Sequence, residues 1–205
     1  SGSKFIIKAE ELIVRNSPPA RYRIHGKVNP DGSILAHDIY GRLNDSEVRG
    51  SFRQNWSDLD FRFLLEGRCM PTEINPWLKD WWDVIWQDFS WDQEIPYGDF
   101  DIKGQWLNRK KRTRTYGTVE VSNISYRDLP LEKGSLKVIV DENKTRITEI
   151  NLFPPTGKVE GNLSFPRSSG NQPLILGFDL KGEMNPTHCR RAFGPVAEKV
   201  LTRFD

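Results

Sequence analysis

The chain has 205 residues, of which 37% are hydrophobic, 28% charged and 11% aromatic, with seven tryptophans and a net charge of +2 at pH 7. This balance excludes a disordered tail and a strongly basic nucleic-acid binder, and no run reaches the roughly 18 apolar residues of a membrane-spanning helix. Two cysteines, Cys69 and Cys189, exclude a disulfide framework but leave one bridge open.

The first third of the chain predicts strands and turns. Segments rich in β-branched and aromatic residues occupy residues 5–65, and polar turn segments interrupt them at residues 16–19, 29–32 and 44–46. The segment 29–32 is the strongest turn, because proline presets one turn position and glycine accepts a positive φ at another. The last strand alternates, and its apolar face would hold Leu59, Phe61, Phe63 and Leu65.

A helix is predicted over residues 75–90. Its apolar residues are spaced i, i+3, i+4, i+7, i+8 and i+11, which places them on one face of an amphipathic helix. Asn75 would cap this helix and Pro76 would take the first helical position. The apolar positions are Leu78, Trp81, Trp82, Ile85, Trp86 and Phe89.

The strand pattern resumes after residue 96 and continues almost to the C-terminus. Successive strands joined by short polar turns imply an antiparallel meander, because parallel neighbours need crossovers of a dozen residues or more. The predicted strands are 99–106, 118–126, 131–140, 146–153, 158–165 and 174–181.

An internal repeat relates the two halves of the chain. The helical spacing of residues 78–89 recurs at 193–204, 115 residues later, and the alternating strand before each helix recurs at the same offset. The sequence therefore predicts a mainly β fold with two short helices. In this fold a curved antiparallel sheet is built from two tandem units, residues 4–95 and 96–205, each closed by an amphipathic helix. We expect the sheet to be continuous and the chain to be part of a longer array.

Motifs for catalysis and metal binding are absent from the sequence. It has no nucleophile elbow, phosphate-binding loop, dinucleotide-binding glycine motif or zinc motif. The pairs Asp58/Asp60 and Asp99/Asp101 are predicted to face solvent from strands, with a glycosidase pair as a minor alternative. The adjacent side chains of His188-Cys189 diverge and make a poor metal clamp. We therefore predict a protein that is not an enzyme and has no cofactor or metal.

A basic run occupies residues 109–114, where five of six residues are cationic. It predicts a charged hairpin tip, and contact with an anionic lipid headgroup is the alternative. The residues that would make this contact are Arg109, Lys110, Lys111 and Arg112. Nucleic-acid binding would require aromatic residues interleaved with the cations. Trp106 and Tyr116 only flank the run, so we predict no nucleic-acid partner.

The order and spacing of these features over residues 4–205 resemble the AsmA-like repeat proteins, the relatives of AsmA and TamB in the envelopes of diderm bacteria. The resemblance is carried in the first unit by Gly50-Ser51-Phe52, the alternation from Phe61 to Leu65, Gly67, Pro71, Asn75-Pro76, Ile95-Pro96 and Gly104. In the second unit it is carried by residues 161–165, 178–182 and 185–186.

The resemblance implies a non-enzymatic module of a periplasmic protein. AsmA-like proteins are anchored in the inner membrane by an N-terminal helix, and their curved sheet forms a hydrophobic groove for phospholipid acyl chains. The implied partners are a phospholipid or another acyl-chain lipid and the rest of the same long chain. Because the sequence lacks the family's membrane anchor, membrane contact would occur through flanking regions.

The hypothesis places an apolar wall for lipid on the strands and helices of both units. Each buried CH₂ contributes about 0.8 kcal/mol, so a partly covered acyl chain would bind. The wall residues would be Phe61, Phe63, Leu65, Trp81, Ile85, Trp86, Leu174, Leu176, Phe178 and Leu180. Two alternatives remain open. One is a purely structural β-repeat with a closed core, and the other is a carbohydrate-binding β-sandwich with Trp77 or Trp91 exposed.

Overall fold

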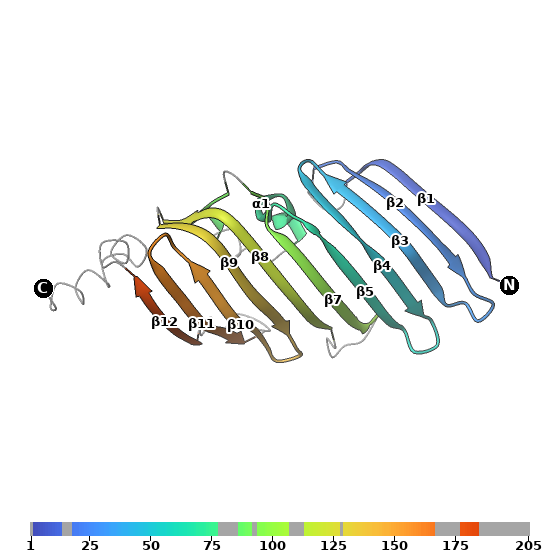
Figure 1. Ribbon diagram of the computed structural model, residues 1–205. Helices are drawn as coiled ribbons and strands as arrows, with labels where there is room; N and C mark the ends of the chain where they lie inside the picture. Colours follow the sequence, from blue (N-terminus) through green and yellow to red (C-terminus); the bar gives the residue numbers. More distant parts are fainter. Residues whose placement is uncertain are drawn as a thin grey trace, which may run out of the picture.

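Alternating apolar and polar residues produce a single antiparallel sheet of 12 strands in the computed structural model (Figure 1). The structure describes residues 2–13, 18–77, 86–91, 94–106, 113–127, 129–166 and 177–184. The strands are β1 (Ser3–Leu12), β2 (Ala20–Val28), β3 (Ile34–Leu43), β4 (Ser46–Asn55), β5 (Asp60–Arg68), β6 (Phe89–Ser90), β7 (Tyr97–Gln105), β8 (Arg114–Tyr126), β9 (Leu129–Val140), β10 (Lys144–Phe153), β11 (Gly157–Pro166) and β12 (Gly177–Met184).

The strands follow one another in chain order across the sheet, except that the short β6 pairs only with β8. The predicted mainly β, antiparallel meander is confirmed, and the sheet is open and curved (Figure 1). The described residues form one sheet rather than the two packed sheets of a β-sandwich, so that alternative was wrong about the fold.

The strand register separates the side chains into two faces. Phe52 lies opposite Phe63, which lies opposite Ile102, whereas the adjacent Arg53 and Arg62 lie opposite each other on the other side. Residues of what we call the apolar face include Phe5, Ile7, Ile24, Ile39, Phe52, Phe63, Ile102, Val119, Val138, Ile147 and Leu163. Residues of the polar face include Lys4, Lys8, Arg23, Lys27, Arg49, Arg62, Glu66, Asp101, Lys137, Glu160 and Lys181.

The turn predicted at residues 29–32 is confirmed. Gly32 has a φ of 80° and its amide donates to the carbonyl of Asn29 at 2.9 Å. A carboxylate oxygen of Asp31 accepts from the amide and the hydroxyl of Ser33, and these bonds lower the pKa of Asp31. The predicted inclusion of Leu59 in the strand that forms β5 was wrong. Leu59 has a φ of 56° in the turn before β5, so it does not share the alternation of that strand.

The helix predicted over residues 75–90 differs from the structure at both described ends. The helical segment begins earlier, with α1 (Pro71–Ile74) and the 3-10 helix η1 (Asn75–Trp77). Pro71 starts α1 and Asn75 has helical φ and ψ at its end, so neither Asn75 nor Pro76 has the predicted role. Phe89 and Ser90 form β6 instead of a last helical turn. Residues 78–85 and the second predicted helix, 193–204, lie outside the described residues.

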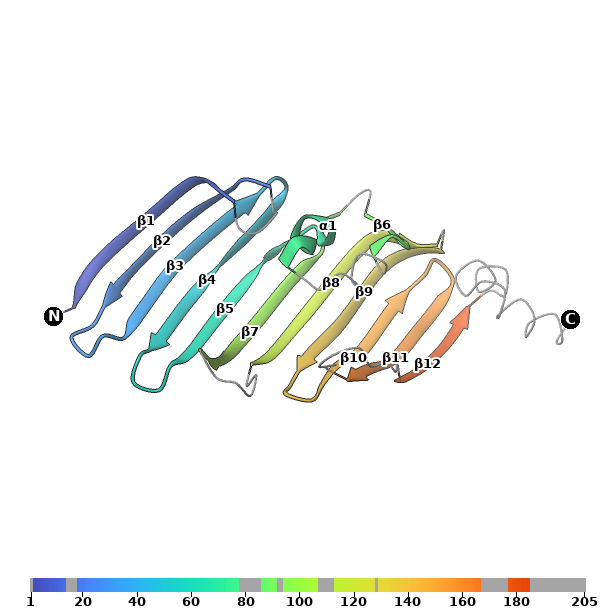
Figure 2. The ribbon, with the colours of Figure 1, turned by 180° about the vertical axis from the view of Figure 1, so that it is seen from behind.

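Few of the described side chains are buried, because a single sheet has no second layer to cover its faces. Only neighbouring side chains and short connecting segments cover them. Figure 2 shows α1 over one face of the sheet at the end of β5. There Ser46 hydrogen-bonds Glu73 and accepts from the amide of Met70 at 2.8 Å. The buried hydrophobic residues among those described are Ala20, Ala36, Leu43, Ile124, Leu129, Leu131, Ile150 and Val159.

Candidate functional site

The apolar face extends over the described strands from β1 to β12. In its middle, the predicted wall residues Phe61, Phe63 and Leu65 project to the same side of β5 and are half-buried. Leu65 lies between Gly50 on β4 and Phe100 on β7, and Phe63 lies between aromatic and aliphatic neighbours. The alternation in the sequence therefore placed these three residues on one surface, as predicted.

Aromatic rings cluster on this part of the apolar face. The ring centroids of Phe52 and Phe63 are 4.5 Å apart, and those of Phe61 and Trp106 are 4.4 Å apart. The indole Nε1 of Trp106 donates to the side-chain oxygen of Gln54, which is only 3% exposed. A buried amide needs such a partner, so Trp106 both packs on Phe61 and satisfies the one polar side chain in this cluster.

Much of the apolar face remains accessible away from this cluster. Ile7 is 51% exposed, Leu12 44% and Val28 37% at the N-terminal end of the sheet, and Leu180 is 39% exposed on β12. Burying such surface contributes about 25 cal/mol per Å², so its exposure is unfavourable unless something covers it. The face therefore combines a self-packed centre with apolar ends that can accept an apolar contact.

A second cluster covers the apolar face near the start of β9. Ile124, Leu129 and Leu131 are its buried residues, and partly buried neighbours pack around them. These neighbours are Phe89, Trp91, Val121, Tyr126 and Leu152. The alternation in the sequence does not predict this cluster. Its only signal was the alternation of Leu129 and Leu131 across Pro130.

Asn123 explains why alternation concealed this cluster. Strict alternation puts residues 121 and 124 on opposite faces, yet Val121 and Ile124 pack together. Asn123 has a φ of 50°, a left-handed conformation that reverses the side-chain direction at that point. Asparagine tolerates this conformation better than most residues, and the Asn123 side-chain amide donates to Glu94 at 3.0 Å.

The remaining wall residues divide into described and undescribed groups. Trp86 is half-buried, with its ring centroid 6.0 Å from that of Trp91. Leu180 lies opposite Gly161 on the apolar face, but its strand is six positions from β5, about 29 Å at the usual strand spacing. The backbone of Phe178 pairs with Leu163, and its side chain is outside the described part. Predicted residues outside the described part are Trp81, Ile85, Leu174, Leu176, Arg109, Lys110, Lys111 and Arg112.

Asp99 and Asp101 both lie on the polar face of β7, as predicted, and Asp101 forms an ion pair with Arg62. Nε and Nη2 of Arg62 donate to the two carboxylate oxygens of Asp101, each at 2.8 Å, a two-bond arrangement across β5 and β7. The hydrogen bond from Arg62 is the main cause of the lowered pKa of Asp101, so this carboxylate is poorly suited to act as a general acid. Asp58 lies in the turn before β5 and not beside Asp60 on the strand, which corrects that pairing.

A cavity of 760 Å³ lies beside the turn between β2 and β3 and the turn between β4 and β5. Phe61 and Gly104 line it together with four cations and four carboxylates. Its charged lining residues are Asp31, Arg53, Asp58, Asp60, Arg62, Lys103, Arg114 and Glu142. This mixed lining does not favour a ligand of one sign.

Metal-binding and reactive groups are sparse in the described part of the chain. Within it, no three His, Cys, Asp or Glu side chains are grouped closely enough to hold a metal ion. Cys69 is half-buried, and burial together with the charge of Glu73 raises the pKa of its thiol. The predicted alternative of a Cys69–Cys189 bridge stays open, because Cys189 lies outside the described residues.

The fold and its faces define a class of protein, an open single-layer antiparallel sheet with one apolar and one polar face. No described helix is both long and apolar enough to cross a membrane. Comparison with protein-family models, curated proteins and solved structures gave no match.

Proposed function

We propose that the chain is a non-enzymatic lipid-binding module whose apolar face holds phospholipid acyl chains, as in the AsmA-like envelope proteins that its sequence resembles. The observation that carries the proposal is the apolar face itself. It continues in register across successive strands, and its side chains are half-buried or exposed over much of its length. A globular protein covers such a face with a second layer, whereas a lipid carrier leaves it for the ligand.

Hydrophobic burial alone supplies enough affinity for this role. Covering eight methylenes of an acyl chain contributes about 6 kcal/mol before the cost of ordering the chain. No reactive group is needed, which is consistent with the lack of catalytic motifs in the sequence. The charges of the polar face would keep two copies of the sheet from stacking through that side.

A structural module is the second candidate, and the cluster around Ile124 favours it. There the chain's own residues, including Phe89 and Trp91, cover the apolar face without any ligand. If other segments covered the rest of the face in the same way, the apolar surface would be a core. The two candidates differ in whether an acyl chain reaches the strands in the middle of the sheet.

We also propose that the sheet is built from two tandem units, each closed by a helix. The hairpin of β4 and β5 and the hairpin of β11 and β12 support this division. Gly50 lies opposite Leu65 in the first, and Gly161 lies opposite Leu180 in the second. A Cβ on either glycine would approach a carbonyl oxygen of the partner strand, at 1.9 Å for Gly50 and 2.1 Å for Gly161.

The irregularities of the sheet also support two units. The register between β3 and β4 shifts at residues 36–39, and the register between β10 and β11 shifts at residues 147–150. The second shift follows the first by 111 residues, which is also the separation of Gly50 and Gly161. Bulges bend strands, so the two units would contribute similar curvature.

The cellular setting follows from the resemblance alone. The proposal places the module in the periplasm, within a longer protein anchored in the inner membrane. Contact of residues 109–112 with lipid headgroups remains a prediction.

Adjacent leucines on β5 provide a matched test of lipid binding. Leu65 lies on the apolar face, and Leu64 lies on the polar face and is 42% exposed. Native mass spectrometry of the purified chain should detect bound phospholipid. Leu65→Asn should lower phospholipid affinity about tenfold, since it removes about 1.5 kcal/mol of apolar contact, and Leu64→Asn should leave affinity unchanged.

The outcomes separate the two candidates. Urea unfolding of both variants would establish that they are folded at the temperature of the binding assay. If folded Leu65→Asn binds phospholipid as tightly as Leu64→Asn, the apolar face is not the lipid site. A wild-type chain that neither retains nor takes up phospholipid would favour the structural module.

A further inference from the structure

The polar face is strongly basic at the N-terminal end of the sheet. Eight cations project from this face of β1–β4. At most four carboxylates share this face of β1–β4 with the eight cations: Glu10, Glu11, Asp38 and Glu47. The whole chain has a net charge of only +2, so charge is concentrated in this region. We call it the basic patch, and its cations are Lys4, Lys8, Arg21, Arg23, Lys27, Arg42, Arg49 and Arg53.

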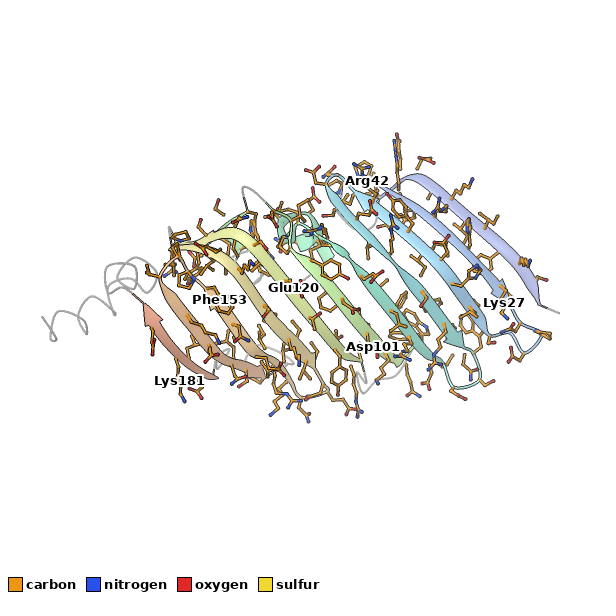
Figure 3. The ribbon with its side chains drawn as sticks, viewed as in Figure 1. Lys27, Arg42, Asp101, Glu120, Phe153 and Lys181 are labelled. Atoms are coloured by element: carbon orange, nitrogen blue, oxygen red, sulfur yellow. The ribbon has the colours of Figure 1, made fainter. Side chains whose placement is uncertain are left out.

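Like charges face each other directly within the basic patch. Lys4 is paired in register with Lys27, and Lys8 with Arg23. Arg21 is likewise opposite Arg42, and Lys27 and Arg42 are labelled on their strands in Figure 3. Directly opposite like charges destabilise a sheet, so this arrangement opposes folding unless an anion offsets it.

Ion pairs within the chain offset only part of this charge. Arg49 contacts Glu47 at 2.9 Å and Arg23 contacts Asp38 at 4.0 Å. Arg21 contacts Glu10 at 3.4 Å, but both of these side chains are more than 70% exposed. Among the described residues, no ion pair involves Lys4, Lys8 or Lys27. These three lysines are exposed on neighbouring strands and are available to an external anion.

One row of the polar face, which begins in the patch, carries a cation on six of seven neighbouring strands. The row runs in register through Lys4, Lys27, Leu35, Arg53, Arg62, Lys103 and Arg114. At the usual strand spacing it is about 29 Å long. Beyond β4 carboxylates balance the row, because Asp101 binds Arg62 and Glu142 lies 3.9 Å from Arg114. The uncompensated charge is therefore that of β1–β4.

Apolar side chains are exposed among the cations of the patch. Ile6 is 66% exposed and lies between Lys4 and Lys8 on β1, and Leu35 is 36% exposed within the cation row. A two-dimensional array of cations with apolar side chains between them fits a surface with anionic groups above a hydrocarbon layer. Single-stranded nucleic acid would instead favour aromatic platforms along the row.

We propose that the basic patch docks this protein on an anionic lipid bilayer, with its cations on lipid phosphates and Ile6 at the interface. This surface lies on the opposite side of the sheet from the apolar face. The inference therefore stands independently of the proposed acyl-chain site. Each cation held near an anionic bilayer strengthens binding about fivefold, and salt weakens this attraction by screening.

A triple variant tests the patch through its unpaired lysines. Wild-type chain should sediment with vesicles of phosphatidylglycerol and phosphatidylcholine, but not with vesicles of phosphatidylcholine alone, and added salt should release it. Lys4→Gln, Lys8→Gln and Lys27→Gln combined should weaken binding to the anionic vesicles about 100-fold. Circular dichroism and urea unfolding would verify that the variant is folded.

The far end of the same face supplies a charge-matched control. Lys137 contacts Glu149, Lys158 contacts Glu160, and Lys181 lies opposite Glu160. Lys137→Gln, Lys158→Gln and Lys181→Gln combined make the same change in net charge where each cation contacts a carboxylate or lies opposite one. This control should change vesicle affinity less than about fivefold.

Ile6→Ser distinguishes a bilayer from another polyanion. It should weaken binding to anionic vesicles but leave any binding to a duplex oligonucleotide unchanged. Equal vesicle affinities of the two triple variants would overturn the proposal, as would equal binding of the wild type to neutral and anionic vesicles. A salt-sensitive preference for the oligonucleotide over vesicles would overturn it in favour of nucleic acid.

Discussion

Gly50 allows β4 and β5 to approach each other, and we predict that a single methyl group there destabilises the sheet. In Gly50→Ala the new Cβ would lie 1.9 Å from the carbonyl oxygen of Leu64 and 2.9 Å from a methyl carbon of Leu65. Because the nearer atom is backbone, no side-chain rotation relieves the contact, and the strands must separate. Overpacking of this kind costs about 1–3 kcal/mol, and weakened hydrogen bonds between the two strands add about 1 kcal/mol. We therefore expect Gly50→Ala to lower the free energy of unfolding by about 3 kcal/mol.

Urea unfolding followed by far-UV circular dichroism would measure this loss as a lower transition midpoint. Gly182→Ala is the control, because its Cβ would lie 3.2 Å from a side-chain methyl of Val159 that can move, and should cost less than about 1 kcal/mol. Gly161→Ala should resemble Gly50→Ala, since its Cβ would lie 2.1 Å from the carbonyl oxygen of Asp179. Equal midpoints for Gly50→Ala and Gly182→Ala would refute this reasoning.

Two further predictions concern the buried cluster and the polar face. Ile124→Ala should lower the free energy of unfolding by about 3 kcal/mol in the same urea assay, because Ile124 is only 5% exposed. A loss below about 1 kcal/mol would contradict the packing of this cluster. Asp101 has a folded-state pKa lowered by Arg62, so its stabilising effect is present above the unfolded pKa and is lost as pH falls through the folded pKa. Asp101→Asn should therefore lose less stability than the wild type on acidification, and an unchanged pH dependence would argue against the ion pair.

The strands of this protein could be predicted because their local signals agree. Apolar and polar residues alternate in β5, and proline and glycine mark the turn before β3. Phe61, Phe63 and Leu65 could be assigned to one face from their spacing alone, since side chains in a strand have a period of two.

Interruptions of that period limited the prediction. Leu59 fits the alternation of β5 but adopts a left-handed turn, and Asn123 reverses the side-chain direction within β8. The buried cluster around Ile124 therefore could not be derived from periodicity. The helical segment was placed too late because both Pro71 and Pro76 suit a first helical position, and the structure uses Pro71.

The basic patch depends on strand register, which the sequence does not specify. Lys4 and Lys27, or Arg53 and Arg62, become neighbours only once the pairing of the strands is known. The sequence alone instead points to the contiguous basic run at residues 109–114, because contiguous charges can be recognised without knowledge of the fold. Cations that occur singly in separate strands form a recognisable surface only once the strands are paired.

Methyl NMR with a spin-labelled phospholipid would test most directly whether the apolar face holds acyl chains. Leu65 and Leu163 lie on the apolar face, and Leu64 and Ile139 lie on the polar face. With a nitroxide on the acyl chain, we expect the methyl signals of Leu65 and Leu163 to broaden, and those of Leu64 and Ile139 to remain sharp. Equal broadening on both faces, or none at Leu65 and Leu163 with lipid bound, would contradict the account.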